Sequence, residues 1–112
     1  MTFSLFLFAH WVGDFVFQTN KMAVNKSRSL KWLVVHVLTY TLILAVFSLF
    51  LLPVIALEFL LINGVFHLLT DFFTSRLAAK YQVNLRIFYL IIGFDQFIHV
   101  ATIYWTVEWF IV

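Results

Sequence analysis

Four long apolar stretches dominate the pattern of hydrophobic and polar positions along the chain. They cover residues 2–19, 32–52, 54–75 and 87–109. A membrane-spanning helix needs about 20 predominantly apolar residues, and each stretch is close to that length. Strands of a transmembrane barrel would alternate apolar and polar residues, whereas these stretches are nearly continuous. The pattern therefore predicts an all-α polytopic bundle of four transmembrane helices, with residues 1–112 forming a single integral membrane domain.

The connections between the stretches predict how the helices are arranged. The turn at Pro53 is very short, so the helices on either side must be antiparallel neighbours. All seven Lys and Arg residues lie in the segments 20–31 and 76–86. By the positive-inside rule both basic segments face the cytoplasm, and both termini face outward.

The composition narrows the class of protein further. Of the 112 residues, 64% are hydrophobic and 11% are charged, whereas a soluble domain has about 25% charged residues. This excludes an ordinary soluble globule and leaves no broad basic face for nucleic acid. The chain has no Cys, so thiolate metal sites are excluded as well. The expected partner is the lipid bilayer, and the large apolar surface is compatible with a homodimer in the membrane.

The four His and three Asp residues all lie inside the apolar stretches. They are His10, Asp14, His36, His67, Asp71, Asp95 and His99. An Asp near the middle of a bilayer costs about 2.5–3.5 kcal/mol on insertion scales, so these side chains must face inward and find partners. Several of them are spaced i, i+4, which places them on one face of a helix.

The depth of these residues predicts a common site. With a helical rise of about 1.5 Å per residue, six of the seven lie roughly 7–15 Å from the cytoplasmic edge. The same estimate places His99 higher, at roughly 20 Å. We therefore expect one shared site in the cytoplasmic half of the bundle, with His99 above its main layer.

A short internal repeat accompanies this site. The segment from His10 to Phe15 matches the segment from His67 to Phe72, because each reads His-x-x-x-Asp-Phe and leads into a basic segment. The match indicates two repeated helical hairpins. In that arrangement the first and third stretches would bring two His-x-x-x-Asp units together across the core.

Imidazole nitrogens and carboxylate oxygens are ligands for Zn, Mn or Fe, so we predict one or two divalent transition-metal ions. The expected ligands are His10, Asp14, His67, Asp71 and Asp95, joined by His36 and His99. Side chains that could orient them are Gln18, Tyr40, Asn63 and Gln96. Basic residues at the depth of lipid phosphates are Lys21, Lys26, Arg28 and Lys31.

Three functions fit this arrangement. A two-metal centre holds the attacking and leaving oxygens of a displaced phosphate, which favours a metal-dependent hydrolase of a phosphorylated lipid or similar headgroup. A chain of His and Asp also suits an ion or proton transporter, and Thr102 and Thr106 continue the polar stripe of His99 outward. The third function is structural, with His–Asp hydrogen-bonded pairs and no metal. The sequence singles out no catalytic residue.

Three motifs together resemble a known family. They are His10-x-x-x-Asp14-Phe15-x-x-Gln18, His67-x-x-x-Asp71 and Asp95-Gln96-x-x-His99, with His36 between them. They are similar to those of an uncharacterised family of small bacterial inner-membrane proteins, a domain of unknown function. The resemblance implies a four-helix protein of the bacterial inner membrane and supplies no activity. Asn20 departs from the acidic residue expected there. A looser likeness, in pattern only, is to predicted membrane-bound metal-dependent hydrolases.

Overall fold

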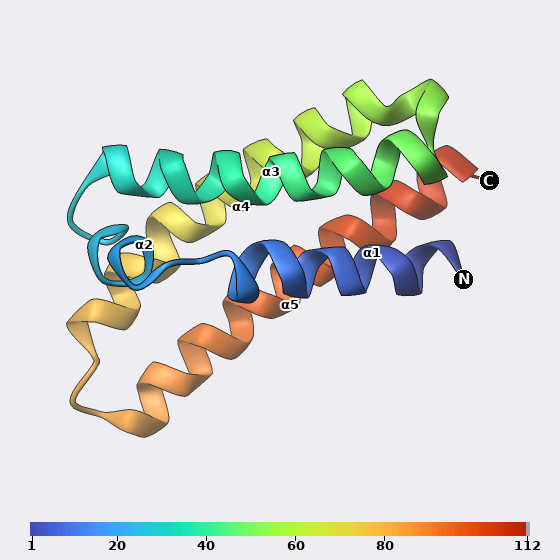
Figure 1. Ribbon diagram of the computed structural model, residues 1–112. Helices are drawn as coiled ribbons and strands as arrows, with labels where there is room; N and C mark the ends of the chain where they lie inside the picture. The colour runs from blue at the N-terminus through green and yellow to red at the C-terminus, as the bar shows by residue number, and fades with distance from the viewer. Residues whose placement is uncertain (112) are drawn as a thin grey trace.

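The computed structural model describes residues 1–111, and this part of the chain is helical without strands (Figure 1). The longer helices are α1 (Thr2–Trp11), α3 (Leu30–Leu51), α4 (Ala56–Lys80) and α5 (Leu85–Ile111). The shorter elements are a π-helical turn (Val12–Val16) that continues α1, helix α2 (Asn20–Asn25) and a 3-10 turn (Pro53–Ile55). The predicted all-α fold class is confirmed.

The four longer helices form a ring around one core. Helix α1 packs against α3 and α5, and α4 packs against the same two helices. Helices α1 and α4 therefore face each other across the core, as the internal repeat predicts. Figure 1 shows α4 and α5 running obliquely to α1 and α3, with α2 beside the start of α3.

Three segments are long and apolar enough to cross a membrane: Leu30–Leu51, Pro53–Lys80 and Leu85–Phe110. The first apolar stretch forms a shorter helix, Thr2–Val16. It ends early because Thr19 adopts an extended conformation and caps α2, its hydroxyl accepting a hydrogen bond from the Met22 amide. The described residues thus contain three candidate spans, and the fourth stays a prediction.

The basic segments are more ordered than the sequence indicates. Residues 20–31 contain helix α2, and α4 continues through Lys80, so the connection to α5 is only residues 81–84. Helix α3 is bounded by Ser29 and Leu52, close to its predicted ends. The predicted helix boundaries therefore agree best with the observed ones where a turn residue interrupts the apolar run.

The core has an apolar half and a polar half. Buried apolar side chains gather toward the end that holds the N-terminus and the end of α5, and they include Phe6, Leu44, Phe59, Ile103 and Val107. Large apolar side chains also cover the outside of the bundle. These outer side chains stay largely exposed in the described residues, as expected for surfaces that face lipid.

Gly13, in the π-helical turn that continues α1, allows this turn and α3 to approach closely. A Cβ atom at Gly13 would lie 3.0 Å from Tyr40 Cδ2 and 3.3 Å from Tyr40 Cα. We expect Gly13→Ala to destabilise the protein by about 1–3 kcal/mol, since overpacking forces the helices apart. The matched control is Gly93→Ala, where the new methyl group meets nothing within 4 Å and Ala is the better helix former. Thermal unfolding of the two variants checks the prediction, and equal midpoints would contradict it.

Candidate metal centre

The seven predicted His and Asp residues are all buried, and five different segments carry them. His10 lies in α1 and Asp14 in the π-helical turn that follows it. His36 comes from α3, and the remaining residues come from α4 and α5. These are His67, Asp71, Asp95 and His99. The shared site expected from the sequence is therefore present as a cluster inside the polar half of the core.

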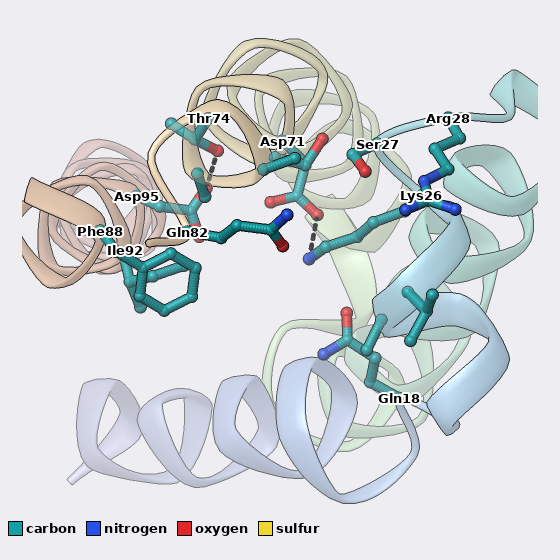
Figure 2. A pocket seen from close by; sticks show the side chains of 15 residues that line it. Gln18, Lys26, Ser27, Arg28, Asp71, Thr74, Gln82, Phe88, Ile92 and Asp95 are labelled. Atoms are coloured by element: carbon teal, nitrogen blue, oxygen red, sulfur yellow. Dashed lines mark hydrogen bonds and ion pairs between the residues drawn. The ribbon is translucent and has the colours of Figure 1, made fainter. Parts of the chain in front are cut away.

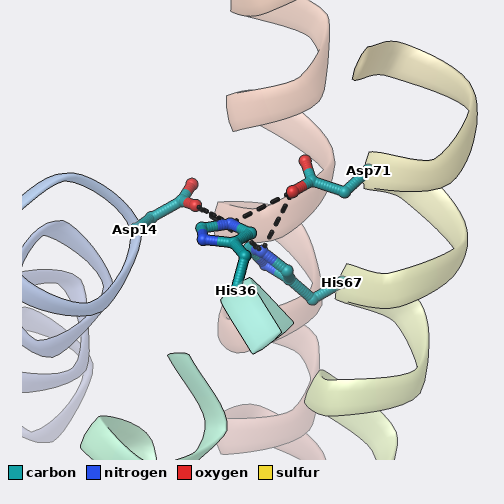
Figure 3. A group of neighbouring side chains, drawn as sticks. All are labelled: Asp14, His36, His67 and Asp71. Atoms are coloured by element: carbon teal, nitrogen blue, oxygen red, sulfur yellow. Dashed lines mark hydrogen bonds and ion pairs between the residues drawn. The ribbon is translucent and has the colours of Figure 1, made fainter. Parts of the chain in front are cut away.

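One group in this cluster consists of Asp14, His36, His67 and Asp71 (Figure 3). The Nε2 atom of His36 lies 2.9 Å from Asp14 Oδ1 and 3.1 Å from Asp71 Oδ2. The Nε2 atom of His67 lies 3.5 Å from each of the same two oxygens. The two Nε2 atoms are 3.2 Å apart. Four potential ligand atoms thus converge on one point.

These separations match the edges of a coordination tetrahedron. Ligand atoms about 2.0–2.1 Å from a tetrahedral ion lie roughly 3.3–3.4 Å from one another. Five of the six separations among the four atoms run from 2.9 to 3.5 Å. The donor set, two imidazoles and two carboxylates, suits a divalent transition metal.

A second group consists of Asp14, Asp95 and His99. The Nε2 atom of His99 lies 3.2 Å from Asp95 Oδ2 and 3.5 Å from Asp71 Oδ1. This buried nitrogen makes no hydrogen bond within the described residues, although both carboxylates are near. Asp14 belongs to both groups, so its carboxylate lies where it could bridge two ions.

His99 lies deeper in the cluster than predicted. The sequence placed it above the main layer, but its ring stacks on that of His67 with centroids 4.0 Å apart. The estimate assumed a helix perpendicular to the membrane. Helix α5 is oblique instead (Figure 1), so each residue rises less along the bundle axis.

His10 is beside the two groups and belongs to neither. Its Nδ1 atom lies 2.9 Å from the Tyr40 hydroxyl, and its Nε2 atom lies 2.7 Å from Gln96 Oε1. Both ring nitrogens are therefore used: Nε2 donates to Gln96, and Nδ1 accepts from Tyr40. The structure places His10 where it orients other groups, whereas the sequence pattern indicated a ligand.

Gln96 connects His10 to the carboxylates. Its Nε2 amide donates to Asp14 Oδ2 at 2.9 Å and to Asp95 Oδ2 at 3.1 Å. Tyr40 contributes in a second way, because its ring stacks on His67 with centroids 3.9 Å apart. Partners of this kind can hold the side chains of a metal site in place, and this role for Gln96 and Tyr40 stays a prediction.

The other two expected supporting residues are placed differently. Asn63 donates hydrogen bonds to Thr106 Oγ1 and to the Phe59 carbonyl, so it ties α4 to α5 outside the cluster. Gln18 lies at a pocket beside the cluster, and its Oε1 atom is buried with no hydrogen-bond partner among the described residues. The end of the helix at Val16 explains why Gln18 leaves the His10–Asp14 stripe.

Two contacts at the cluster were not foreseen. Lys26 Nζ donates to Asp71 Oδ2 at 3.2 Å, whereas the sequence pattern indicated a lipid-facing lysine. Thr74 donates to Asp95 Oδ1. The position of Thr74, three residues after Asp71 on the same face of α4, could have revealed it. Nothing in the local sequence indicates that Lys26 turns inward. Lys21, Arg28 and Lys31 are exposed.

The comparisons with known proteins identify the family. A family model described as "Protein of unknown function (DUF3307)" matches residues 2–111. Because this match covers nearly the whole chain, the protein belongs to that family, and the resemblance found in the motifs is confirmed. Searches of curated proteins and of solved structures found no match.

Proposed function

We propose that this member of the family binds two divalent transition-metal ions in the His/Asp cluster and is a metal-dependent hydrolase of a phosphorylated lipid or similar headgroup. The observation that carries the proposal is the convergence of Asp14, His36, His67 and Asp71 on one point, at separations suited to a tetrahedral ion. Asp14 also belongs to the second group, which supports a pair of ions.

Hydrogen bonds alone satisfy this cluster poorly. His36 Nε2 lies within 3.2 Å of three atoms, contributed by Asp14, Asp71 and His67. A neutral imidazole has one N–H, so it serves only one of these partners well. A cation at the centre would interact favourably with all four atoms at once. This favours a metal site over His–Asp pairs that serve only the fold.

Charge balance supports the same conclusion. Asp14, Asp71 and Asp95 carry three negative charges when ionised, and the only Lys or Arg side chain paired with them in the described residues is Lys26. Buried carboxylates are expensive unless they are paired. Two divalent ions supply the missing positive charge, and several acidic ligands are common where phosphate esters are hydrolysed.

The position of the cluster favours hydrolysis over transport. Toward the other end of the bundle the core is closed by Phe6, Phe59 and Ile103, all fully buried. The hydroxyls of Thr102 and Thr106 donate to carbonyls of their own helix and do not extend a polar path. On the opposite side, Asp71 and Asp95 line a pocket of 450 Å³. The cluster is therefore accessible from one end, as a hydrolytic site requires.

The chemistry at this site can be stated simply. Two divalent ions would supply the Lewis acidity for attack of water on a phosphate ester. The phosphorus–oxygen ester bond breaks, and the products are phosphate and the lipid alcohol. The protein positions the carboxylates through Gln96 and Thr74, and the buried environment strengthens their interaction with the substrate's charge.

The activity test uses protein in lipid nanodiscs, loaded with Mn or Zn, and phosphatidic acid as substrate. We expect metal-dependent release of phosphate, lost in Asp14→Ala. Ion or proton flux in proteoliposomes without phosphate release would instead support the transporter. If metal-loaded protein releases phosphate from no phosphorylated lipid, the hydrolase proposal fails.

We also propose that the chain lies in the bacterial inner membrane with the basic segments in the cytoplasm and both termini outside. Because the chain has no Cys, single cysteines can report orientation without background. Val54 and Val83 are 92% and 91% exposed and lie in opposite connections. In intact spheroplasts, an impermeant maleimide is expected to label Val54→Cys and to spare Val83→Cys. The reverse pattern would contradict this orientation.

A further inference from the structure

A pocket adjoins the metal cluster on the side of the basic segment that precedes α3 (Figure 2). Its volume of 450 Å³ is in the range of small-molecule sites. Asp71 and Asp95 form its wall toward the cluster, while Lys26, Ser27 and Arg28 line it from the turn after α2. The pocket thus connects the candidate metal centre to a positively charged surface.

Two buried polar atoms of this pocket have no hydrogen-bond partner among the described residues. They are Gln18 Oε1 and Ser75 Oγ. Burying an unpaired polar group is unfavourable, so such atoms at a pocket wall indicate a polar ligand. The opposite wall is apolar, where Phe88 and Ile92 project from α5 (Figure 2). A ligand with a charged head and an apolar chain fits both walls.

Lys26 is the basic residue that reaches the cluster. Its side chain is 17% exposed, and its ammonium group lies 3.2 Å from Asp71 Oδ2. That oxygen is also one of the four atoms that converge on the first ion position, 3.1 Å from His36 Nε2. The ammonium group and a metal ion therefore compete for one carboxylate oxygen.

We propose that this pocket binds the phosphorylated headgroup of an amphiphile, and that metal binding frees Lys26 from Asp71 to hold the phosphate beside Arg28. The inference rests on the proposed function, because the ion that releases Lys26 is the hydrolytic one. Like charges repel, so an ion bound to Asp71 drives the ammonium group into the pocket. The amphiphile's chain then lies along Phe88 and Ile92. Metal and phosphate binding are thereby coupled.

The test measures binding of a short-chain phosphonate analogue of phosphatidic acid, which resists hydrolysis, by calorimetry with the full-length protein. Inorganic phosphate and the matching diacylglycerol are the comparison ligands. Wild-type protein is measured after Mn loading and after chelator treatment. Lys26→Met and Arg28→Gln remove the proposed charges, and Lys31→Met is the control from the same basic segment, outside the pocket.

We expect the Mn-loaded wild type to bind the phosphonate more tightly than the chelated protein does. Lys26→Met should weaken this binding about tenfold, as loss of one charge-assisted hydrogen bond predicts, and Arg28→Gln should weaken it in the same direction. Lys31→Met should have no effect. Lys26→Met should also bind Mn more tightly than the wild type, because the competing ammonium group is gone. If Lys26 merely stabilised the fold, its removal would not increase the affinity for Mn.

The inference is overturned if Mn binds but phosphonate affinity is the same with and without it. This comparison needs only the wild type, so it remains decisive if Lys26→Met fails to fold. Equal affinity for phosphonate and inorganic phosphate overturns the amphiphile assignment, and equal affinity for the diacylglycerol overturns the role of charge. Failure of the wild type to bind Mn or Zn contradicts the proposed function itself.

Discussion

Replacing Asp14 with Ala is expected to abolish binding of both metal ions, whereas Asp95→Ala should leave one ion bound. The difference follows from geometry, since Asp14 belongs to both ligand groups and Asp95 to only the second. Removing Asp14 leaves His36, His67 and Asp71 without their fourth partner and separates the second group from the first. Elemental analysis of both variants, with metal counted per chain, measures the effect.

Two controls make this comparison informative. Asn63→Ala removes a buried polar side chain that bonds to Thr106 rather than to the cluster, so it should keep both ions. His10→Phe should weaken metal binding, roughly 10–100-fold in affinity, because His10 acts through Gln96. Equal metal content in the Asp14→Ala and Asp95→Ala proteins would contradict a shared carboxylate.

Metal removal is expected to lower the thermal stability of the protein substantially. A ligand that binds only the folded state stabilises it by about 4 kcal/mol when present at about 1,000 times its dissociation constant. Without metal, the carboxylates of the cluster lose their main counter-charge. We therefore expect a clear fall in the unfolding midpoint after treatment with a chelator, restored by Zn or Mn and measured by differential scanning fluorimetry.

His67→Phe tests whether this shift depends on the ligand nitrogen. Phe keeps a flat ring between Tyr40 and His99, whose rings stack on that of His67, but it removes the Nε2 atom. The variant should show a smaller metal-dependent shift than the wild type, because only the second group keeps all its ligands. Asn63→Ala should unfold earlier than the wild type and still respond to metal. A metal-dependent shift in His67→Phe as large as in the wild type would contradict the assignment.

The sequence predicted that the His and Asp residues gather in the core, because burial in a membrane protein leaves few explanations for charged side chains in apolar stretches. Asp14 and Asp71 lie in apolar stretches and at matching positions of a repeat, so an inward position followed from the cost of exposing a carboxylate to lipid. The helical spacing then predicted which neighbours share a face. Together these arguments predicted that His36, His67 and His99 face the same core.

The features that the sequence did not predict depend on the directions in which helices and turns run in three dimensions. Lys26 follows α2, and only the turn after that helix directs its ammonium group to Asp71. The oblique course of α5 brings the ring of His99 to the level of His67. A depth calculated from the helical rise per residue does not include this tilt. The π-helical turn at Asp14 and the end of the helix at Val16 interrupt an apolar stretch that the hydrophobic pattern alone indicates to be continuous.

The most direct test of the central claim is the metal content of the wild-type protein, purified in detergent without chelators and measured beside Asp14→Ala. Convergence of the imidazoles and carboxylates on two ion positions predicts two Zn, Mn or Fe ions per wild-type chain and none in the variant. Wild-type protein that carries no more metal than Asp14→Ala, and takes up none when Zn, Mn or Fe is added, would contradict it.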